Sequence, residues 1–104
     1  MAHVVSNVEE FKNLTEKGVV LIDFYADWCG PCRMQAPIIE QISDYYKNNI
    51  TVLKINTDHA PELAEMFRIR SIPTLVLIKD KTILKQEAGF KTMQQLQDWI
   101  NPNL

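Results

Sequence analysis

A closely spaced pair of cysteines, Cys29 and Cys32, is the feature of this sequence best suited to chemistry. The two residues lie in the stretch ADWCGPCRM, residues 26–34, separated only by Gly30 and Pro31, and the chain has no other cysteine. Such a pair can supply half of a metal site, form a small structural disulfide, or act as a redox couple. The function depends on which of these roles the pair has.

Two of these three roles have weak support. A metal site usually needs four ligands, and the only histidines, His3 and His59, lie too far apart in the sequence to supply the usual second pair. A structural disulfide closing so short a loop would contribute about 2 kcal/mol, against about 4.7 kcal/mol for a loop of about 100 residues. A redox couple is favoured, because a C-x-x-C pair near a β-α-β pattern has that precedent.

The pair lies at a predicted junction between a strand and a helix. Residues 19–26 form a nearly continuous apolar run, which predicts a strand covered on both faces, and helical spacing runs from Pro31 to about Tyr46. The free N–H groups of a first helical turn stabilise a thiolate. We therefore expect Cys29 to be the exposed, attacking thiolate and Cys32, one turn further on, to be the sheltered resolving thiol.

The remaining elements alternate between helix and strand. A capping box of Ser6 and Glu9 begins a first helix that ends at Gly18, and a second capping box, Thr92 with Gln95, begins the last helix. The helix after the cysteines is expected to kink at Pro37. The other predicted elements are a short β segment over 3–5, a strand over 50–56, a helix over 60–67, and a hairpin of strands over 74–79 and 83–89.

This order of elements, β-α-β-α-β-α-β-β-α, predicts an α/β fold with a mixed central β-sheet flanked by helices on both faces. The chain has 104 residues, of which 46% are hydrophobic, so we expect one globular domain over residues 1–104. The candidate core residues are Phe11, Phe24, Ile42, Phe67, Leu77 and Trp99.

Charge and hydropathy patterning argue against several functional classes. The formal net charge is −2 and no basic stripe occurs, so nothing indicates a nucleic-acid partner. No apolar run approaches the roughly 18 residues that span a bilayer, so we expect no membrane association. The first residues, MAHVVSNVEEF, lack the pattern of a secretory signal, and we expect a cytoplasmic monomer in which two cysteines serve catalysis rather than a disulfide framework.

Several segments resemble the thioredoxin family over nearly the full length of the chain. WCGPC, residues 28–32, resembles the active-site motif, and VVLIDFYADWCGPCRMQAP resembles the strand, turn and kinked helix around it. VLKINTD, IRSIPTLVLIK and AGF resemble further signatures, in the right order. The resemblance implies a small protein-disulfide reductase with the thioredoxin fold, which needs no bound cofactor and is recharged by a thioredoxin reductase.

Asp23 is unusual because it interrupts the apolar strand on the face that also carries Val19, Leu21 and Tyr25. Its carboxyl group should be buried, and burial of an isolated charge raises the pKa of an acid. The resemblance implies that Asp23 transfers a proton to and from Cys32; the alternative is a paired structural carboxylate. The resemblance also suggests that Lys54 approaches Asp23 and modulates it, whereas by pattern alone Lys54 could equally extend to solvent.

A substrate-binding surface is implied around the two sulfurs. The resemblance predicts a cis peptide bond before Pro73, packed against the cysteines, and backbone hydrogen bonds from Ile72 to an extended substrate peptide. By pattern alone Pro73 would be an ordinary residue at the start of a strand. The predicted apolar surface consists of Trp28, Gly30, Pro31, Ile72, Pro73 and Gly89.

Four residues depart from the commonest pattern of the family. Tyr25 stands where tryptophan is usual, Arg33 where lysine is commoner, and Ser71 and Lys81 where glycine is frequent. None of them removes a catalytic element. We therefore predict a thiol–disulfide oxidoreductase that reduces protein disulfides, with two alternatives: an oxidase or isomerase of the same fold, and a non-catalytic binding subunit that uses the apolar surface.

Overall fold

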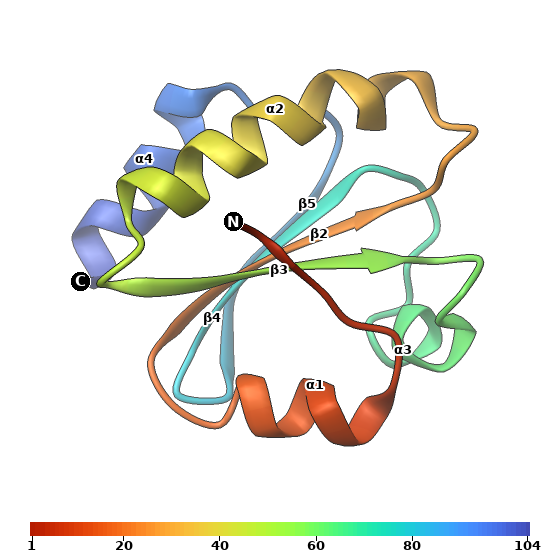
Figure 1. Ribbon diagram of the computed structural model, residues 1–104, viewed down its shortest axis with the longest axis horizontal. Helices are drawn as coiled ribbons and strands as arrows, with labels where there is room; N and C mark the ends of the chain where they lie inside the picture. Colours follow the sequence, from red (N-terminus) through yellow and green to blue (C-terminus); the bar gives the residue numbers. More distant parts are fainter.

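The computed structural model describes all of residues 1–104, and its elements follow the predicted order (Figure 1). The strands are β1 (His3–Val4), β2 (Val19–Tyr25), β3 (Ile50–Asn56), β4 (Thr74–Lys79) and β5 (Thr82–Ala88). The helices are α1 (Val8–Leu14), α2 (Gly30–Tyr45), α3 (Pro61–Met66) and α4 (Met93–Ile100), followed by the 3₁₀ turn η1 (Asn101–Asn103). No helix combines the length and the apolar character needed to cross a bilayer.

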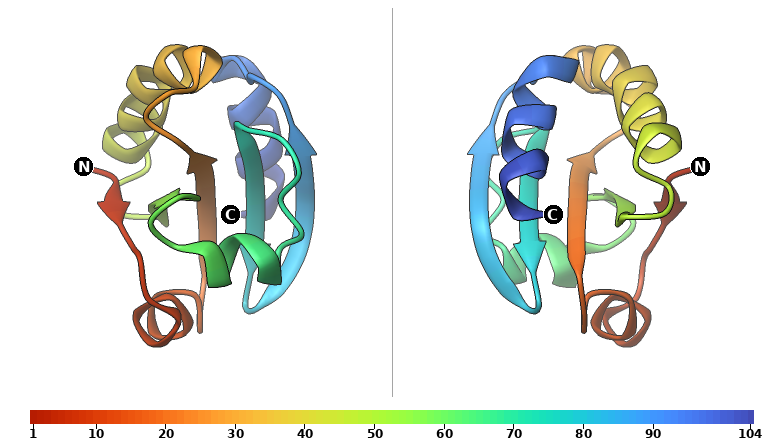
Figure 2. Two further views of the ribbon diagram at one scale, coloured as in Figure 1. Left: turned by 90° about the vertical axis from the view of Figure 1, so that its right-hand side faces the viewer. Right: turned by 90° about the vertical axis from the view of Figure 1, so that its left-hand side faces the viewer.

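The five strands form one mixed sheet in the order β1-β3-β2-β4-β5. β3 runs parallel to both β1 and β2, whereas β4 runs antiparallel to β2 and β5. Figure 2 shows the strands side by side, with β4 and β5 joined as a hairpin at one side of the sheet. β2 is therefore the central strand, and its carboxyl end leads directly to the cysteines at the start of α2.

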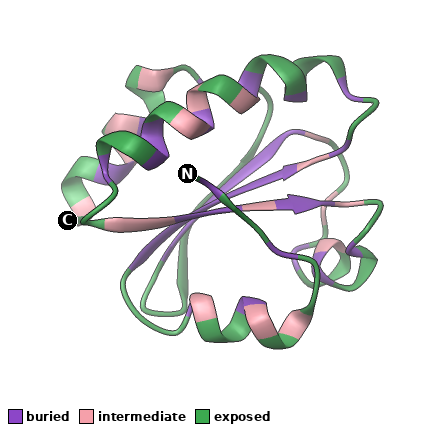
Figure 3. Cartoon of the chain, viewed as in Figure 1, coloured by how far each residue is buried: buried purple, intermediate pink, exposed green.

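Helices cover both faces of the sheet, as the sequence predicts (Figure 1). Alternate β2 residues Val20, Ile22 and Phe24 point into a core cluster beneath α1 and α3, and the intervening residues Val19 and Leu21 point into a second cluster beneath α2 and α4. Figure 3 shows the burial of the central strands that results. β5, at the edge, is exposed along its whole length.

The predicted core is confirmed apart from one residue. Phe11, Phe24, Ile42, Phe67 and Leu77 are all buried. Trp99 is only partly buried and packs against the cluster beneath α2 and α4.

The beginning of α1 differs from the prediction. Asn7, rather than Ser6, is the N-cap, and its side chain accepts a hydrogen bond from the Glu10 backbone N–H at 2.8 Å. The helix ends at Leu14, and Gly18 instead lies in the turn before β2 with a φ of +81°. The second predicted capping box, Thr92 with Gln95, is present at the start of α4. α2 continues through Pro37.

Candidate active site

Cys29 and Cys32 form a disulfide at the beginning of α2. Cys29 is the N-cap of the helix, and its sulfur accepts a hydrogen bond from the Cys32 backbone N–H at 3.2 Å. Unpaired N–H groups at a helix N-terminus carry partial positive charge. The predicted position of the pair, between a buried strand and a helix N-terminus, is confirmed.

The two cysteines do not differ in exposure as the sequence suggested. Each is 4% exposed, so the expectation of an exposed Cys29 beside a sheltered Cys32 is wrong for the disulfide form. A distant segment of the chain covers Cys29, because its sulfur lies 3.7 Å from the carbonyl oxygen of Ile72. The two sulfurs differ instead in hydrogen bonding, because the Cys29 sulfur accepts a hydrogen bond from the Cys32 backbone N–H.

Asp23 lies in the middle of the sheet, with 1% of its surface exposed. Asp23 lies two residues after Leu21 in β2, so its side chain is on the same face of the sheet, the face that α2 covers. Neither of its carboxylate oxygens has a hydrogen-bond partner in the protein. Burial raises the pKa of Asp23 from 3.8 to about 7, and the nearby positive charge of Lys54 opposes this shift. The predicted rise in pKa is thus supported, and no partner supports the alternative of a paired structural carboxylate.

Lys54 lies beside Asp23 in the register between β2 and β3. Its Nζ is also 4.8 Å from the centre of the Tyr25 ring, a cation–π arrangement. A pocket of about 260 Å³ is lined by Lys54, Tyr25 and Cys32 among others. Lys54 therefore influences the buried carboxyl group while part of its side chain reaches the surface, which combines the two roles that the sequence left open.

The Ile72–Pro73 peptide bond is cis, as the family resemblance implies. The segment packs against the disulfide through the Ile72 carbonyl oxygen. Gly89 contacts the same loop, because its N–H donates a hydrogen bond of 2.8 Å to the Pro73 carbonyl oxygen. Gly89 adopts a φ of +101°, a conformation that favours glycine. Three of the predicted substrate-binding residues, Ile72, Pro73 and Gly89, thus lie together, and Ile72 is next to the Cys29 sulfur.

Trp28 immediately precedes Cys29, and 68% of its surface is exposed. Its indole N–H donates to a carboxylate oxygen of Asp58 at 2.9 Å, which fixes the ring. Together with Ile72 and Arg70, Trp28 lines a groove of about 360 Å³. Gly30 begins the exposed first turn of α2.

Two site features were missed in the sequence. The first feature is Asp58, which follows β3 and accepts the hydrogen bond from the Trp28 indole. A polar residue after a strand is common, so the sequence gave no indication of this contact. The second feature is Gln35, a fully buried residue of α2 that is hydrogen-bonded to the backbone of Lys91. The position of Gln35, three residues after Cys32 and on the core side of the helix, could have predicted that it is buried. Its partner, Lys91, is too distant in the sequence to be identified from a local pattern.

Comparisons with known proteins agree with this geometry. The thioredoxin family model matches residues 2–102. This chain belongs to the thioredoxin family. The thioredoxin of Bacillus subtilis is 38% identical over the full length of both chains, and that of Rickettsia felis is 40% identical, again over the full length of both. A mutant thioredoxin from Halobacterium salinarum superposes with a TM-score of 0.91 at 35% identity, over 98% of this chain and 89% of the other.

Family membership and the C-x-x-C disulfide establish the general activity. The chain is a protein-disulfide reductase that works by dithiol–disulfide exchange, and the thioredoxin family implies disulfide-containing protein substrates and a thioredoxin reductase. The fold is the thioredoxin fold that the sequence predicted.

The four departures from the family pattern all lie outside the disulfide. Tyr25 contacts Lys54 as described above, and an Arg33 guanidinium N–H donates to the Asp27 carbonyl oxygen at 3.0 Å. The Ser71 carbonyl oxygen accepts a hydrogen bond of 2.6 Å from the Thr74 hydroxyl. Lys81 has a φ of 74° in the turn between β4 and β5.

Proposed function

We propose that Cys29 is the nucleophile and Cys32 the resolving thiol of this reductase. The Cys29 thiolate attacks one sulfur of the substrate disulfide, forms a mixed disulfide and releases the other substrate sulfur as a thiolate. Cys32, once deprotonated, attacks the Cys29 sulfur and releases the second substrate thiol. Two electrons pass to the substrate and the Cys29–Cys32 disulfide remains, so the dithiol needs no bound cofactor. The observation that carries the assignment is the Cys32 N–H directed at the Cys29 sulfur.

Asp23 is proposed to take the proton from Cys32, directly or through a water molecule. A general base works best when its pKa is close to the working pH, and the pKa of about 7 for Asp23 meets this condition. Lys54 favours the ionised carboxylate electrostatically and so limits the rise in pKa. Lys54 therefore modulates the base without touching the reacting sulfurs.

The substrate is proposed to dock as an extended segment across the disulfide. The Ile72 backbone, which lies beside Cys29 and precedes the cis bond to Pro73, would pair with the substrate backbone. Trp28, Gly30, Pro31 and Gly89 would supply further contact surface. Backbone pairing is largely independent of side chains, so this arrangement is suited to many protein disulfides.

The setting that we propose is the cytoplasm, where a thioredoxin reductase regenerates the dithiol of a monomeric, single-domain protein. Bacterial relatives named thioredoxin that match over their full length support this proposal. Fractionation of cells and light scattering of the purified protein test the location and the monomeric state.

Reduction of insulin tests the assignment of the two cysteines. The wild type should reduce insulin catalytically, and Cys29→Ser should lose all activity. Cys32→Ser should accumulate a mixed disulfide through Cys29, which mass spectrometry of the trapped adduct identifies. Trapping through Cys32 in Cys29→Ser but not through Cys29 in Cys32→Ser would reverse the assignment. The measured reduction potential then separates a reductant from an oxidase of the same fold, since about 30 mV corresponds to 1.4 kcal/mol.

A further inference from the structure

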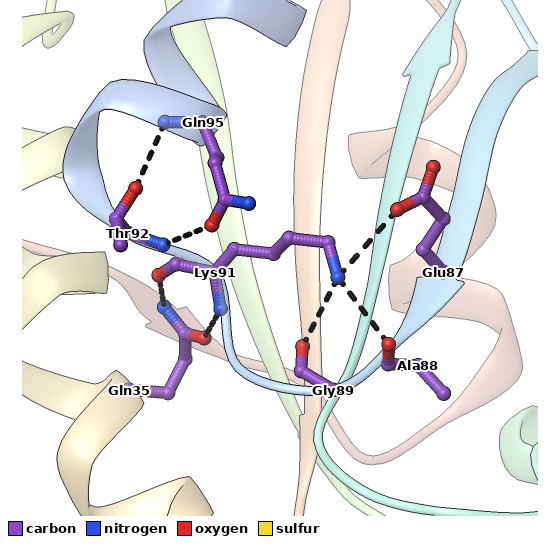
Figure 4. A network of polar contacts seen from close by, with 7 residues as sticks. All are labelled: Gln35, Glu87, Ala88, Gly89, Lys91, Thr92 and Gln95. Carbon is purple, nitrogen blue, oxygen red and sulfur yellow. Dashed lines mark hydrogen bonds and ion pairs between the residues drawn. The ribbon is translucent and has the colours of Figure 1, made fainter.

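Gln35 is a buried polar residue of α2 that the reaction itself does not use. Its side chain is 0% exposed, and it makes two hydrogen bonds with the backbone of one residue, Lys91 (Figure 4). The amide nitrogen of Gln35 donates to the Lys91 carbonyl oxygen at 3.0 Å, and its amide oxygen accepts from the Lys91 N–H at 2.8 Å. These bonds satisfy both backbone groups of Lys91 inside the protein, where an unpaired polar group is costly.

The Lys91 side chain extends the same network toward Gly89. Its Nζ donates to the carbonyl oxygens of Ala88 at 3.3 Å and Gly89 at 3.4 Å, and it lies 3.6 Å from a carboxylate oxygen of Glu87 (Figure 4). Only 10% of the side chain is exposed. The segment that connects β5 to α4 is therefore held both from its backbone and from its own side chain.

This segment also touches the substrate-binding loop. The Gly89 N–H donates to the Pro73 carbonyl oxygen at 2.8 Å. On the other side, Gln35 lies one turn beyond Cys32 in the same helix. A continuous series of hydrogen bonds thus runs from the helix that carries the cysteines, through Lys91 and Gly89, to the residue that follows Ile72.

We propose that Gln35 is a positioning residue that sets the spacing between the disulfide and the Ile72–Pro73 loop. The cysteines and this loop belong to different elements, so their separation depends on ties between α2 and the segment before α4. Gln35 supplies the buried polar tie at the end of α2 nearest the disulfide. The inference rests on the proposed docking of substrate along Ile72, since spacing matters only if the substrate occupies that gap.

The test compares Gln35→Met with Tyr46→Phe. Methionine has a similar length but leaves both Lys91 backbone groups unpaired, so the loop should lose its fixed position. We expect the KM for insulin to rise about three- to tenfold, with kcat changed less than about twofold. Reduction of a small aromatic disulfide, which does not need the extended docking site, should be unchanged.

Tyr46→Phe is the matched control because it removes a partly buried hydrogen bond at the opposite end of α2. The Tyr46 hydroxyl donates to the Asn101 side-chain oxygen at 2.6 Å, near the C-terminal end of α4. The variant should be less stable than wild type with an unchanged KM for insulin. An equal rise in KM for Tyr46→Phe would show a general loss of stability and would overturn the proposal.

Gln35→Glu provides a second variant should the methionine variant not fold. A protonated carboxyl group can make the same donor and acceptor pair with Lys91, whereas a carboxylate can only accept. The charged side chains around the network are Lys91 and Glu87. The KM of Gln35→Glu for insulin should match that of wild type at low pH and should exceed it increasingly as pH rises. If the ratio of the two KM values does not depend on pH, the inference is contradicted.

Trp28→Ala separates failure of this inference from failure of the docking proposal. Trp28 is exposed and belongs to the proposed docking surface, so its loss should raise the KM for insulin. If Trp28→Ala raises KM and Gln35→Met leaves it within twofold of wild type, only the role of Gln35 is overturned. If neither variant changes KM, the docking site itself is wrong.

Discussion

Burial of Asp23 couples proton binding at the active site to the free energy of unfolding. The pKa of Asp23 is about 7 in the folded protein and near its ordinary value of 3.8 once the chain unfolds. Between these values the folded state binds more protons than the unfolded state, so stability decreases as pH rises. The destabilisation is absent below about pH 4 and complete above about pH 7, the reverse of the behaviour of a carboxylate in a salt bridge.

Replacement of this single residue should therefore change the pH profile. Each pKa unit corresponds to about 1.4 kcal/mol, so the difference in pKa amounts to about 4 kcal/mol. We predict that Asp23→Asn, in the disulfide form, gains about 4 kcal/mol in unfolding free energy over wild type between pH 4 and pH 8. Urea titrations of both proteins at these two pH values measure the change.

The control for this prediction is an exposed acid. Glu16→Gln removes a carboxylate at the surface, where no comparable burial exists, and should leave the pH profile as it is. Parallel profiles for Asp23→Asn and wild type would mean that Asp23 titrates as an ordinary aspartate.

At the scale of elements, the N-terminus of α1 offers a direct test of which residue caps the helix. Asn7→Ala should destabilise the protein by about 1 kcal/mol, because the Glu10 N–H loses its acceptor. Ser6→Ala should change stability by less than about 0.5 kcal/mol, since Ser6 makes no capping bond. Thermal unfolding of both variants is the measurement, and a larger loss for Ser6→Ala would restore the cap predicted from the sequence.

The turn between β4 and β5 places two non-glycine residues at positive φ. Asp80 and Lys81 have φ values of 48° and 74°, a pattern found in two-residue type I′ turns. The Asp80 side chain is used there, accepting from the Gly18 N–H at 2.7 Å, but Lys81 makes no such bond. We predict that Lys81→Gly stabilises the protein by about 1 kcal/mol.

The comparison for this turn is Lys85→Gly in the extended strand β5. There glycine brings no relief of backbone conformation and should cost about 0.5–1 kcal/mol. Chemical denaturation of the two variants beside wild type gives the answer. A loss of stability for Lys81→Gly would indicate that flexibility of the unfolded chain outweighs the strain at this position.

These elements also show how far the sequence could lead. The order of helices and strands, the position of the cysteines and the burial of Asp23 followed from local periodicity, since each depends on neighbours along one strand or helix. Ser6 and Asn7 are both favourable N-cap residues, so the sequence pattern alone did not decide between them. The packing of the Ile72–Pro73 loop against Cys29 joins distant segments and was predicted only through the family resemblance. The pairing of Gln35 with Lys91 also joins distant segments, and neither a local pattern nor the resemblance predicted it.

At the scale of the whole molecule, the central sheet lies between two hydrophobic clusters and contributes side chains to both. Leu53 and Leu77 are each 0% exposed, but Leu53 packs in the cluster beneath α1 and α3 and Leu77 in the cluster beneath α2 and α4. Both strands that carry them pair with β2. Loss of packing on either face should therefore weaken the same central strand, so we expect the two cores to unfold together.

We accordingly predict one cooperative unfolding transition for residues 1–104. Leu53→Ala and Leu77→Ala should each lower the unfolding free energy by about 2–5 kcal/mol. In both variants, far-UV circular dichroism and tryptophan fluorescence should change at the same urea concentration, as for a two-state protein. Trp99 packs against only the second cluster, and the other tryptophan, Trp28, belongs to neither cluster. Two separate transitions in Leu53→Ala would therefore show that the core containing Leu53 unfolds without the other. Coincident transitions mean that disruption far from the disulfide also reaches the site, because β2 connects both cores to α2.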